Sequence, residues 1–258
     1  MKIVILAGGY GTRLSELTRD IPKPMVEIGG YPILWHIMQI YAAHGFNDFV
    51  VALGYKGNLI KEFFLDYYTN HSDLVVNLKD GSVEVKNNQG LDWKITLVDT
   101  GEGTMTGGRV KRLKPYLNET FMLTYGDGVS NVDLTELLKF HKKNQTLVTM
   151  TTIHPTSKYG KLDINTDNKV ERFVEKPEFG GDWINGGFMV IEPEFLDWIE
   201  NDQTTLEQEP LLKATETGNL SAFKHAGFWH CMDTLRDRDE LESLWQSKQP
   251  PWKIWHNK

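Results

Sequence analysis

The chain has 258 residues, enough for one large α/β domain or two small ones. Its formal net charge of -7 argues against a general nucleic-acid-binding protein, which needs a basic surface. If the ligands are phosphates, cations must therefore gather locally on an acidic protein. Cys231 is the only cysteine, which excludes an intrachain disulfide and indicates a reducing compartment.

The N-terminus does not have the pattern of an export signal. The apolar run from Ile3 to Ala7 is short and is followed at once by Gly8 and Gly9. Elsewhere, no segment approaches the roughly 20 apolar residues of a membrane helix. We therefore expect a cytoplasmic protein with neither a membrane nor a nucleic acid as its partner.

Strand and helix patterns alternate along the chain, which predicts a layered α/β sheet. The continuous apolar run over residues 2–7 is typical of a strand buried on both faces, as in a parallel sheet. In chain order, the predicted strands are residues 2–7, 49–53, 95–98, 121–125, 147–153, 161–164, 170–174 and 184–191. The predicted helices are residues 32–44, 58–67, 134–143, 194–199, 205–217 and 236–246. The strands 161–164 and 170–174 flank a turn-forming sequence and predict an antiparallel hairpin.

The segment LAGGYGTRL, residues 6–14, follows the first strand and is typical of a phosphate-binding turn. Its glycines let the backbone approach a ligand closely and point N–H groups at it. Thr12 adds a hydroxyl, and Arg13 adds a forked cation suited to phosphate oxygens. A tight turn with no ligand is the alternative. A Walker A loop is excluded because Gly-Lys-Ser/Thr is absent, and a dinucleotide fingerprint needs a glycine where Leu14 stands.

Lys23 lies between Pro22 and Pro24, soon after this turn. The two prolines restrict the backbone around Lys23 and hold its side chain in a preset direction. A lone lysine is usually a solvated surface charge. A lysine fixed in this way, close to a phosphate-binding turn, favours a phosphate contact instead.

Two aspartates follow predicted apolar stretches and are candidates for a metal site. Asp127 comes directly after the strand 121–125, at the kind of strand end where open α/β sheets bind ligands. Asp233 follows the apolar stretch of FWHCMDT and precedes a predicted helix. An ordinary Asx turn is the alternative for Asp127, and a helix cap is the alternative for Asp233. Mg²⁺ bound to a polyphosphate is usually held by one or two such carboxylates.

Two further motifs suit a sugar phosphate. In FVEKP, Lys176 is suited to the phosphate and Glu175 to the sugar hydroxyls, with an exposed ion pair as the alternative. In INGGF, Asn185 offers an amide, and Gly186 allows a sugar ring to lie against the backbone. A β-bulge is the alternative at INGGF.

Taken together and in this order, the motifs GGYGTRL, PKPM, YGDG, VEKP, INGGF and MDT resemble those of the nucleoside-diphosphate-sugar pyrophosphorylases. The resemblance extends from Leu6 to Thr234. It implies a doubly wound α/β fold with a mostly parallel mixed sheet, which is a Rossmann-like nucleotidyltransferase core, and a smaller mixed sugar-binding portion. Because we see no repeat and no low-complexity linker, we expect a single domain over residues 1–258. Its nucleotide-binding half would be residues 1–130, its sugar-binding half residues 131–240 and its tail residues 241–258.

The resemblance also implies a role for each motif residue. Arg13 would contact the triphosphate and Lys23 the phosphate under attack, while Asp127 and Asp233 would hold Mg²⁺. The sugar-phosphate-binding residues that it implies are Lys176, Glu175, Asn185 and Gly186. The nucleotide-binding residues that it implies are Leu6, Ala7, Gly8, Gly9, Gly11, Thr12, Arg13, Lys23, Thr104, Gly108, Arg109 and Gly128.

Within this family, the chain is most similar to the glucose-1-phosphate cytidylyltransferase branch. The stretches that carry this similarity are MVEIGGYPILWHIM, VDTGEGTMTGGRVKR, TTLEQEPL, GFWHCMDTLRD and PPWKIW. Small departures from the branch occur at Leu206 and Cys231. The similarity implies transfer of a cytidylyl group from CTP to glucose 1-phosphate by in-line displacement, giving CDP-glucose for the dideoxyhexoses of lipopolysaccharide O-antigen. It also implies a homo-oligomer, for which a hexamer is one possible size. The apolar tail is a plausible contact between its subunits.

The choice of base has some physical support. In the predicted loop 104–109, Thr104 and Arg109 are able to donate hydrogen bonds to the acceptors of cytosine, and the backbone beside Gly108 is able to read the remaining edge. The alternative for Arg109 is a surface residue on a solvated helix. Uracil shares one acceptor with cytosine, so a UDP- or dTDP-sugar pyrophosphorylase of the same family stays open. A catalytically silent subunit is disfavoured because Lys23 and both aspartates are present.

Overall fold

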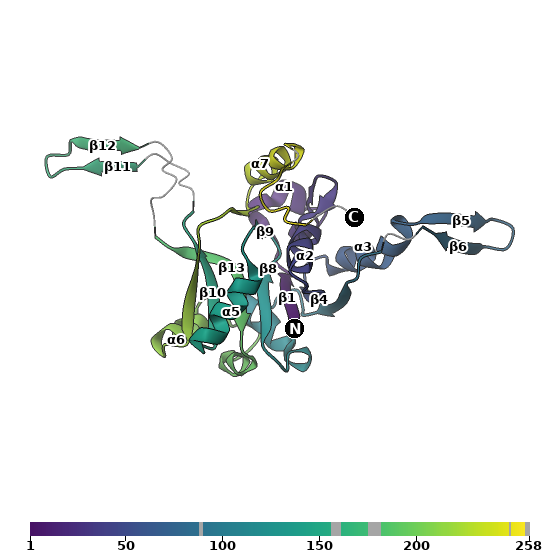
Figure 1. The fold of residues 1–258 in the computed structure, drawn as a ribbon, viewed down its shortest axis with the longest axis horizontal. Coiled ribbons are helices and arrows are strands. Elements are labelled where there is room, and N and C mark those ends of the chain that lie inside the picture. Colours follow the sequence, from purple (N-terminus) through teal and green to yellow (C-terminus); the bar gives the residue numbers. More distant parts are fainter. Residues whose placement is uncertain (88–89, 156–160, 175–181, 248, 256–258) are drawn as a thin grey trace.

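A computed structural model describes residues 1–87, 90–155, 161–174, 182–247 and 249–255. In this part of the chain, a seven-stranded sheet forms the centre of the molecule (Figure 1). In sheet order, its strands are β14 (Leu220–His225), β10 (Val148–Ile153), β13 (Ile184–Ile191), β8 (Phe121–Tyr125), β1 (Lys2–Ala7), β4 (Asp48–Leu53) and β7 (Lys94–Asp99). Only β13 runs antiparallel to its neighbours β8 and β10 in this sheet. The predicted fold class, a doubly wound and mostly parallel mixed sheet, is confirmed.

The chain changes direction across the sheet next to β1. From β1 it adds β4 and then β7 on one side, and it returns to place β8 on the other side of β1. Open α/β sheets bind ligands at such a switch point, beyond the carboxyl ends of the strands. The glycine turn follows the carboxyl end of β1 and Asp127 follows that of β8, so the topology brings both predicted motifs to one edge of the sheet.

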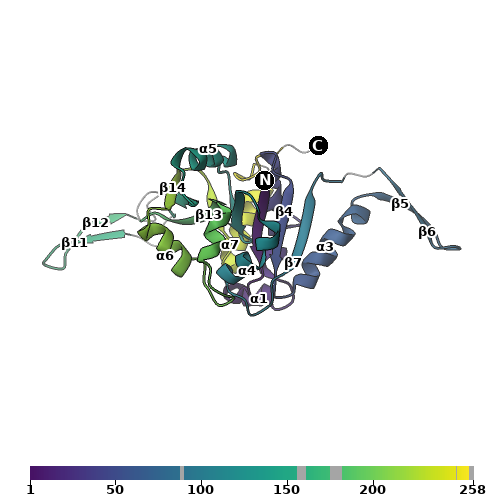
Figure 2. The same cartoon turned by 90° about the horizontal axis from the view of Figure 1, so that it is seen from below.

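Helices cover both faces of the sheet (Figure 2). They are α1 (Ser15–Thr18), α2 (Ile33–Ala43), α3 (Gly57–Asn70), α4 (Thr106–Arg112), α5 (Leu134–Asn144), α6 (Glu209–Glu216) and α7 (Leu235–Gln246). The 3-10 helices are η1 (Thr12–Leu14), η2 (Lys23–Met25), η3 (Lys114–Tyr116) and η4 (Pro193–Trp198). Alternate residues of β1 enter different cores, Ile3 and Ile5 on the side of α2, and Val4 and Leu6 on the side of α4. This two-sided burial explains why the first strand is a continuous apolar run.

Among the described residues, four small two-stranded sheets lie outside the central sheet. They are β2 (Glu27–Ile28) with β3 (Tyr31–Pro32), β5 (Asp73–Asn77) with β6 (Ser82–Lys86), β9 (Gly128–Ser130) with β15 (Trp229–Cys231), and β11 (Lys161–Ile164) with β12 (Val170–Val174). The last pair confirms the predicted antiparallel hairpin. The hairpins β5–β6 and β11–β12 project on opposite sides of the central sheet (Figures 1 and 2).

One expectation about the second half needs correction. A helix was expected over residues 205–217, but α6 begins only at Glu209. Pro210 lies in its first turn, where the missing N–H costs nothing, whereas an earlier start would place this proline in the helix interior. The apolar tail is expected to contact another subunit. Trp252 does not supply such a contact, because it is fully buried in its own chain, where its ring stacks on Phe228 and Trp245.

The buried tail encloses His36 on α2. The Nε2 atom of His36 lies 2.8 Å from the carbonyl oxygen of Ile28, and its Nδ1 atom lies 3.4 Å from Trp252 Nε1. A carbonyl only accepts and an indole N–H only donates, so the imidazole is neutral with its proton on Nε2. Burial, which outweighs the effect of the Ile28 carbonyl, lowers the pKa of His36 from 6.5 to about 4.

None of the helices in the described ranges combines the length and apolarity of a membrane span.

We expect His36 to make the stability of the fold depend on pH between 6.5 and about 4. The unfolded chain takes up a proton as the pH falls through 6.5, whereas the folded chain resists protonation until about 4. The contribution of neutral His36 to the free energy of unfolding is therefore complete above pH 6.5, and it is lost as the pH falls toward about 4. At about 1.4 kcal/mol per pH unit, the loss is up to about 3 kcal/mol.

Urea unfolding of the wild type and of His36→Gln at several pH values measures this contribution. The glutamine keeps an N–H donor for Ile28 but does not titrate. The free energy of unfolding of the variant should vary less steeply over this interval. Equal slopes for the two proteins would exclude His36 as the cause.

Candidate active site

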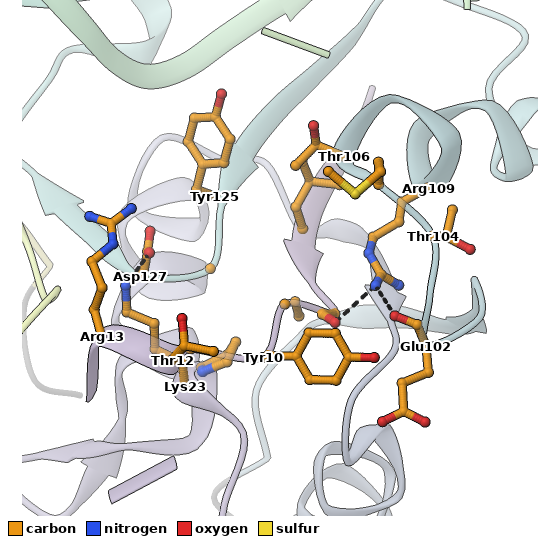
Figure 3. A pocket seen from close by; sticks show the side chains of 18 of the residues that line it. Tyr10, Thr12, Arg13, Lys23, Glu102, Thr104, Thr106, Arg109, Tyr125 and Asp127 are labelled. Atoms are coloured by element: carbon orange, nitrogen blue, oxygen red, sulfur yellow. Dashed lines mark hydrogen bonds and ion pairs between the residues drawn. The ribbon is translucent and has the colours of Figure 1, made fainter. Parts of the chain in front are cut away.

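A cavity of about 430 Å³ opens beyond the carboxyl ends of β1 and β8 (Figure 3). Its volume lies in the range of small-molecule sites. It gathers the glycine turn, η2, the segment 102–106, the end of β8 and Asp233. The predicted site residues that line it are Leu6, Ala7, Gly8, Gly9, Gly11, Thr12, Arg13, Lys23, Thr104, Arg109, Asp127 and Asp233.

The glycine turn reverses the chain between β1 and η1. Gly11 has φ of +63°, and a Cβ atom there would lie 2.9 Å from Cγ2 of Thr18. The hydroxyl of Thr18 donates to the carbonyl of Gly11 at 2.9 Å and fixes the exit of the turn. The turn therefore needs glycine at position 11 for both its backbone conformation and its packing.

Arg109 on α4 braces the loops around the cavity from inside. Its side chain lies so close to the glycine turn that a Cβ atom on Gly8 would be 2.4 Å from its Nη1 atom. Its guanidinium donates to the carbonyl oxygens of Gly8 (2.9 Å), Leu53 (3.2 Å), Gly101 (2.6 Å) and Glu102 (3.0 Å) and to the hydroxyl of Thr100 (2.9 Å). Figure 3 shows the guanidinium directed at the backbone of these loops. One side chain thus joins the glycine turn, the end of β4 and the loop 100–102.

This placement corrects two expectations. The surface alternative for Arg109 is wrong, since the residue is only 4% exposed. The loop 104–109 was expected to be irregular, but helix α4 begins at Thr106. A hydrogen bond from Arg109 to a base would compete with the bonds that it makes to the protein. Burial lowers the pKa of Arg109 and outweighs the raising effect of Tyr10.

Lys23 joins the two predicted metal-binding aspartates. Its Nζ atom lies 2.6 Å from Asp127 Oδ2 and 2.8 Å from Asp233 Oδ1. Arg13 approaches the other oxygen of Asp233 at 3.0 Å. The side chain of Lys23 is 12% exposed, whereas that of Arg13 is 76% exposed at the rim of the cavity. The four charges form one connected and nearly neutral cluster.

The antiparallel pair β9–β15 explains how these aspartates meet. Gly128 pairs with Cys231 at the ends of the two strands, and the N–H of Met232 donates to the carbonyl of Asp127 at 2.9 Å. Asp127 precedes β9 and Asp233 closely follows β15, so the pairing places them side by side although 106 residues separate them (233 − 127). Burial of Lys23 lowers its pKa, but the carboxylates of Asp127 and Asp233 outweigh this and leave it raised above 10.5.

Asp233 is not the cap of helix α7. Thr234 is the N-cap, and its side chain accepts a hydrogen bond from the N–H of Asp237 in a capping box. The carboxylate of Asp237 in turn accepts from the N–H groups of Asp233 and Thr234. The capping alternative is therefore wrong, and the carboxylate of Asp233 is directed to Lys23 and Arg13. Although burial opposes it, the contact with Lys23 lowers the pKa of Asp233 below 3.8.

The cluster fits a divalent cation. Ligand atoms of Asp127, Cys231 and Asp233 lie within 4.8 Å of one another. Mg²⁺ is usually bound by one or two carboxylates together with substrate phosphates, and it retains several waters. Asp127 and Asp233 provide such a pair. Burial, followed by the carboxylate of Asp127, raises the pKa of the Cys231 thiol, which keeps it protonated at neutral pH.

The remaining predicted residues fall in three groups. Lys176 and Glu175 lie outside the described residues. Asn185 donates to the hydroxyl of Tyr125 at 3.1 Å, and it stands at a register shift between β10 and β13, so a bulge is present at INGGF. Gly186 lies in the same bulge, with its carbonyl accepting from Trp229.

Gly108 and Gly128 were expected beside the nucleotide, but the structure places them in backbone packing. A Cβ atom on Gly108 would lie 2.4 Å from the carbonyl oxygen of Asp202, and Gly128 pairs with Cys231. The sequence prediction did not include several other residues that line the cavity. These are Tyr10, Pro24, Glu102, Gly103, Met105, Thr106, Tyr125 and Gly126. Tyr10 lies within the motif GGYGTRL and Tyr125 within YGDG. Their position beside predicted site residues was the sequence signal that could have identified them.

Residues 2–234 match the family model described as nucleotidyl transferase. The chain therefore belongs to the nucleotidyl transferase family, which generally uses a divalent metal, and the family predicted from the motifs is confirmed.

The chain is similar over its whole length to proteins with a named reaction. It is 50% identical to the glucose-1-phosphate cytidylyltransferase of Salmonella typhimurium, over 99% of this chain and 100% of that protein. Among solved structures, it is similar to HddC from Yersinia pseudotuberculosis, with a TM-score of 0.70 and 25% identity over 95% of this chain and 99% of that one. A second structure of HddC, in complex with GMP-PN, aligns equally well.

We expect Arg109→Lys to loosen the cavity loops even without a ligand. A lysine keeps the charge, but its ammonium cannot replace a planar guanidinium that reaches five acceptors. Hydrogen–deuterium exchange of the ligand-free protein should become faster at residues 8–11 and 100–104, and the melting temperature should fall. Arg112→Lys is the matched control on the same helix, because Arg112 is exposed and pairs with Asp202. Unchanged exchange in Arg109→Lys would show that Arg109 does not brace these loops.

Proposed function

We propose that this protein transfers the cytidylyl group of CTP to α-D-glucose 1-phosphate, giving CDP-glucose and pyrophosphate. The observation that carries the proposal is the cluster of Lys23 with Asp127 and Asp233 beside the glycine turn. It places cations and metal-binding carboxylates where a triphosphate fits. The end-to-end similarity to a glucose-1-phosphate cytidylyltransferase supports the choice of substrates.

The proposed reaction is a single in-line displacement. A phosphate oxygen of glucose 1-phosphate forms a bond to the α-phosphorus of CTP, and the bond from that phosphorus to the β-phosphate oxygen breaks. The electron pair of the broken bond leaves with pyrophosphate. No general base is needed, because a sugar phosphate with a second pKa of about 6 is already ionised at neutral pH. Catalysis then depends on positioning and on neutralising charge, as in phosphoryl transfer generally.

The cationic side chains have distinct places in this reaction. Lys23 is held deep in the cavity by its two carboxylates, so its ammonium is suited to the α-phosphate under attack. Arg13 stands at the rim, where its exposed fork is suited to the outer phosphates of CTP. Asp127 and Asp233 would hold Mg²⁺, which neutralises phosphate charge when bound. On the sugar side, Asn185 and Gly186, together with Lys176 and Glu175, remain the predicted contacts.

The base would lie against the segment 102–105. Thr104 lines the cavity and is nearly buried, so its hydroxyl is suited to reading a base edge. A site built on hydrogen bonds rejects a base that lacks the matching groups far better than an apolar pocket does. If UTP or dTTP were the preferred substrate, the protein would still belong to the same family but would be a UDP- or dTDP-sugar pyrophosphorylase.

We also propose that the protein acts in the cytoplasm as a homo-oligomer, for which a hexamer is one possible size. The hairpin β5–β6 supports an assembly, since its apolar residues are exposed on both faces and Leu78 at its tip is 92% exposed. An isolated two-stranded hairpin is at best marginally stable in water, so a covering surface would stabilise it. The product would serve the dideoxyhexoses of lipopolysaccharide O-antigen.

Pyrophosphate release tests the proposed function. Purified protein, Mg²⁺ and glucose 1-phosphate are mixed with CTP, UTP, dTTP, GTP or ATP in turn. We expect fastest release with CTP, and we expect release to stop when EDTA removes the metal and to return with Mg²⁺. Fastest release with another triphosphate would contradict the assignment of CTP as the substrate. Release that is unaffected by EDTA would contradict the proposed requirement for a metal ion.

We expect Lys23→Ala to lower turnover by at least about tenfold, since one electrostatic donor contributes 100- to 1,000-fold elsewhere. Lys142→Ala, at an exposed position on α5, is the control for loss of a lysine. Circular dichroism checks that both variants fold. Wild-type turnover in folded Lys23→Ala would exclude the proposed role of Lys23.

A further inference from the structure

The carboxylate of Glu207 accepts hydrogen bonds from two hydroxyl groups of residues that line the cavity. Glu207 precedes α6 and is half-buried. Its Oε1 atom accepts a hydrogen bond from the hydroxyl of Tyr125 at 2.6 Å, and its Oε2 atom accepts one from the hydroxyl of Thr106 at 2.7 Å. Hydrogen bonds to an ionised acceptor are roughly twice as strong as those between neutral groups. Glu207 therefore fixes both side chains at once.

The two hydroxyls belong to different walls of the cavity. Tyr125 ends β8 and stands two residues before the metal-binding candidate Asp127. Thr106 begins α4, directly after the segment 102–105 that faces the proposed base. Both side chains line the cavity, and Figure 3 shows them beside each other on one side of it. Glu207 thus connects the metal side to the base side.

Tyr125 extends the connection to the sugar side. Its hydroxyl accepts from Asn185 Nδ2 at 3.1 Å while it donates to Glu207, and Asn185 Oδ1 accepts from the N–H of Gly187 at 2.8 Å. The amide of Asn185 is therefore oriented from both ends.

Thr106 is fixed from both ends in the same way. Its oxygen accepts from the N–H of Leu206 at 2.9 Å while its proton is donated to Glu207. The same segment of the second half holds α4 by its backbone, because the N–H of Gly108 donates to Thr204 at 3.2 Å. The start of α4 therefore depends on residues 204–207.

We propose that Glu207 is a positioning residue that sets the geometry of the sugar-phosphate site relative to the nucleotide site. It acts through Tyr125 and Thr106 and does not itself touch the substrates. The inference rests on the proposed function, because the two sites must hold the attacking oxygen and the α-phosphorus in line. A small misplacement of such groups is enough to lower the rate strongly.

The test compares Glu207→Gln with Glu209→Gln, an exposed glutamate two residues further on. Glutamine keeps the shape and one acceptor, but its NH₂ group cannot accept from the second hydroxyl. We expect Glu207→Gln to raise KM for glucose 1-phosphate and to lower kcat, each by about tenfold, while KM for CTP changes less. Glu209→Gln should behave as the wild type. A purely structural role would lower the melting temperature without changing these constants in the folded protein.

Tyr125→Phe separates positioning from a direct effect of the charge. If Glu207 acts through Tyr125, the double variant Tyr125→Phe/Glu207→Gln should raise KM for glucose 1-phosphate by less than the product of the two single effects. Fully multiplicative effects would overturn the connection through Tyr125. Wild-type constants in Glu207→Gln would overturn the positioning role altogether.

Failure of the proposed function would look different. If the wild type prefers another triphosphate or another sugar phosphate, the same variants are compared with that pair. If the wild type turns over no combination of triphosphate and sugar phosphate, hydrogen–deuterium exchange still tests whether Glu207 positions these residues. Glu207→Gln should then accelerate exchange at residues 104–108 and 185–187 relative to Glu209→Gln, and unchanged exchange would overturn the inference.

Discussion

The ammonium of Lys23 between the carboxylates of Asp127 and Asp233 is the interaction on which the site depends. Without it, two carboxylates would face each other in a partly enclosed cavity, where like charges repel more strongly than in water. With Lys23 and Arg13, the cluster is nearly neutral. A nearly neutral cluster does not attract a polyphosphate by itself. A divalent cation on the two carboxylates would supply the missing positive charge, which reconciles a phosphate substrate with an acidic protein.

The fold supplies this cluster from three distant parts of the chain. The switch point beside β1 places the glycine turn and the end of β8 at one edge of the sheet, and the pair β9–β15 brings Asp233 to Asp127. One buried and one half-buried side chain, Arg109 and Glu207, then tie the loops together. Arg109 joins the glycine turn to the loop 100–102, and Glu207 joins the end of β8 to the start of α4. The chemistry lies on loops, but the loops are held by the scaffold.

Local sequence patterns predicted the elements that carry a strong local signal, such as β1 and the β11–β12 hairpin. They also predicted motif residues that line the cavity, such as Gly11 and Asp127, because phosphate-binding glycines and strand-end aspartates are local features, whereas Gly108 and Gly128 lie in backbone packing. The roles of Arg109 and Glu207 were not predictable in this way. A guanidinium bound to the carbonyl of Gly8 and a carboxylate bound to Tyr125 depend on contacts between residues more than 80 positions apart. The spacing of residues in a sequence does not reveal such contacts.

Calorimetric binding of CTP, with and without Mg²⁺, tests the central claim most directly. The account predicts that CTP binds the wild type more tightly with Mg²⁺ than in EDTA. It also predicts that Asp127→Asn and Asp233→Asn each weaken this dependence, since each removes one metal-binding carboxylate. Equal affinity of the wild type with and without Mg²⁺, or full metal dependence in both variants, would contradict a shared metal site at Asp127 and Asp233.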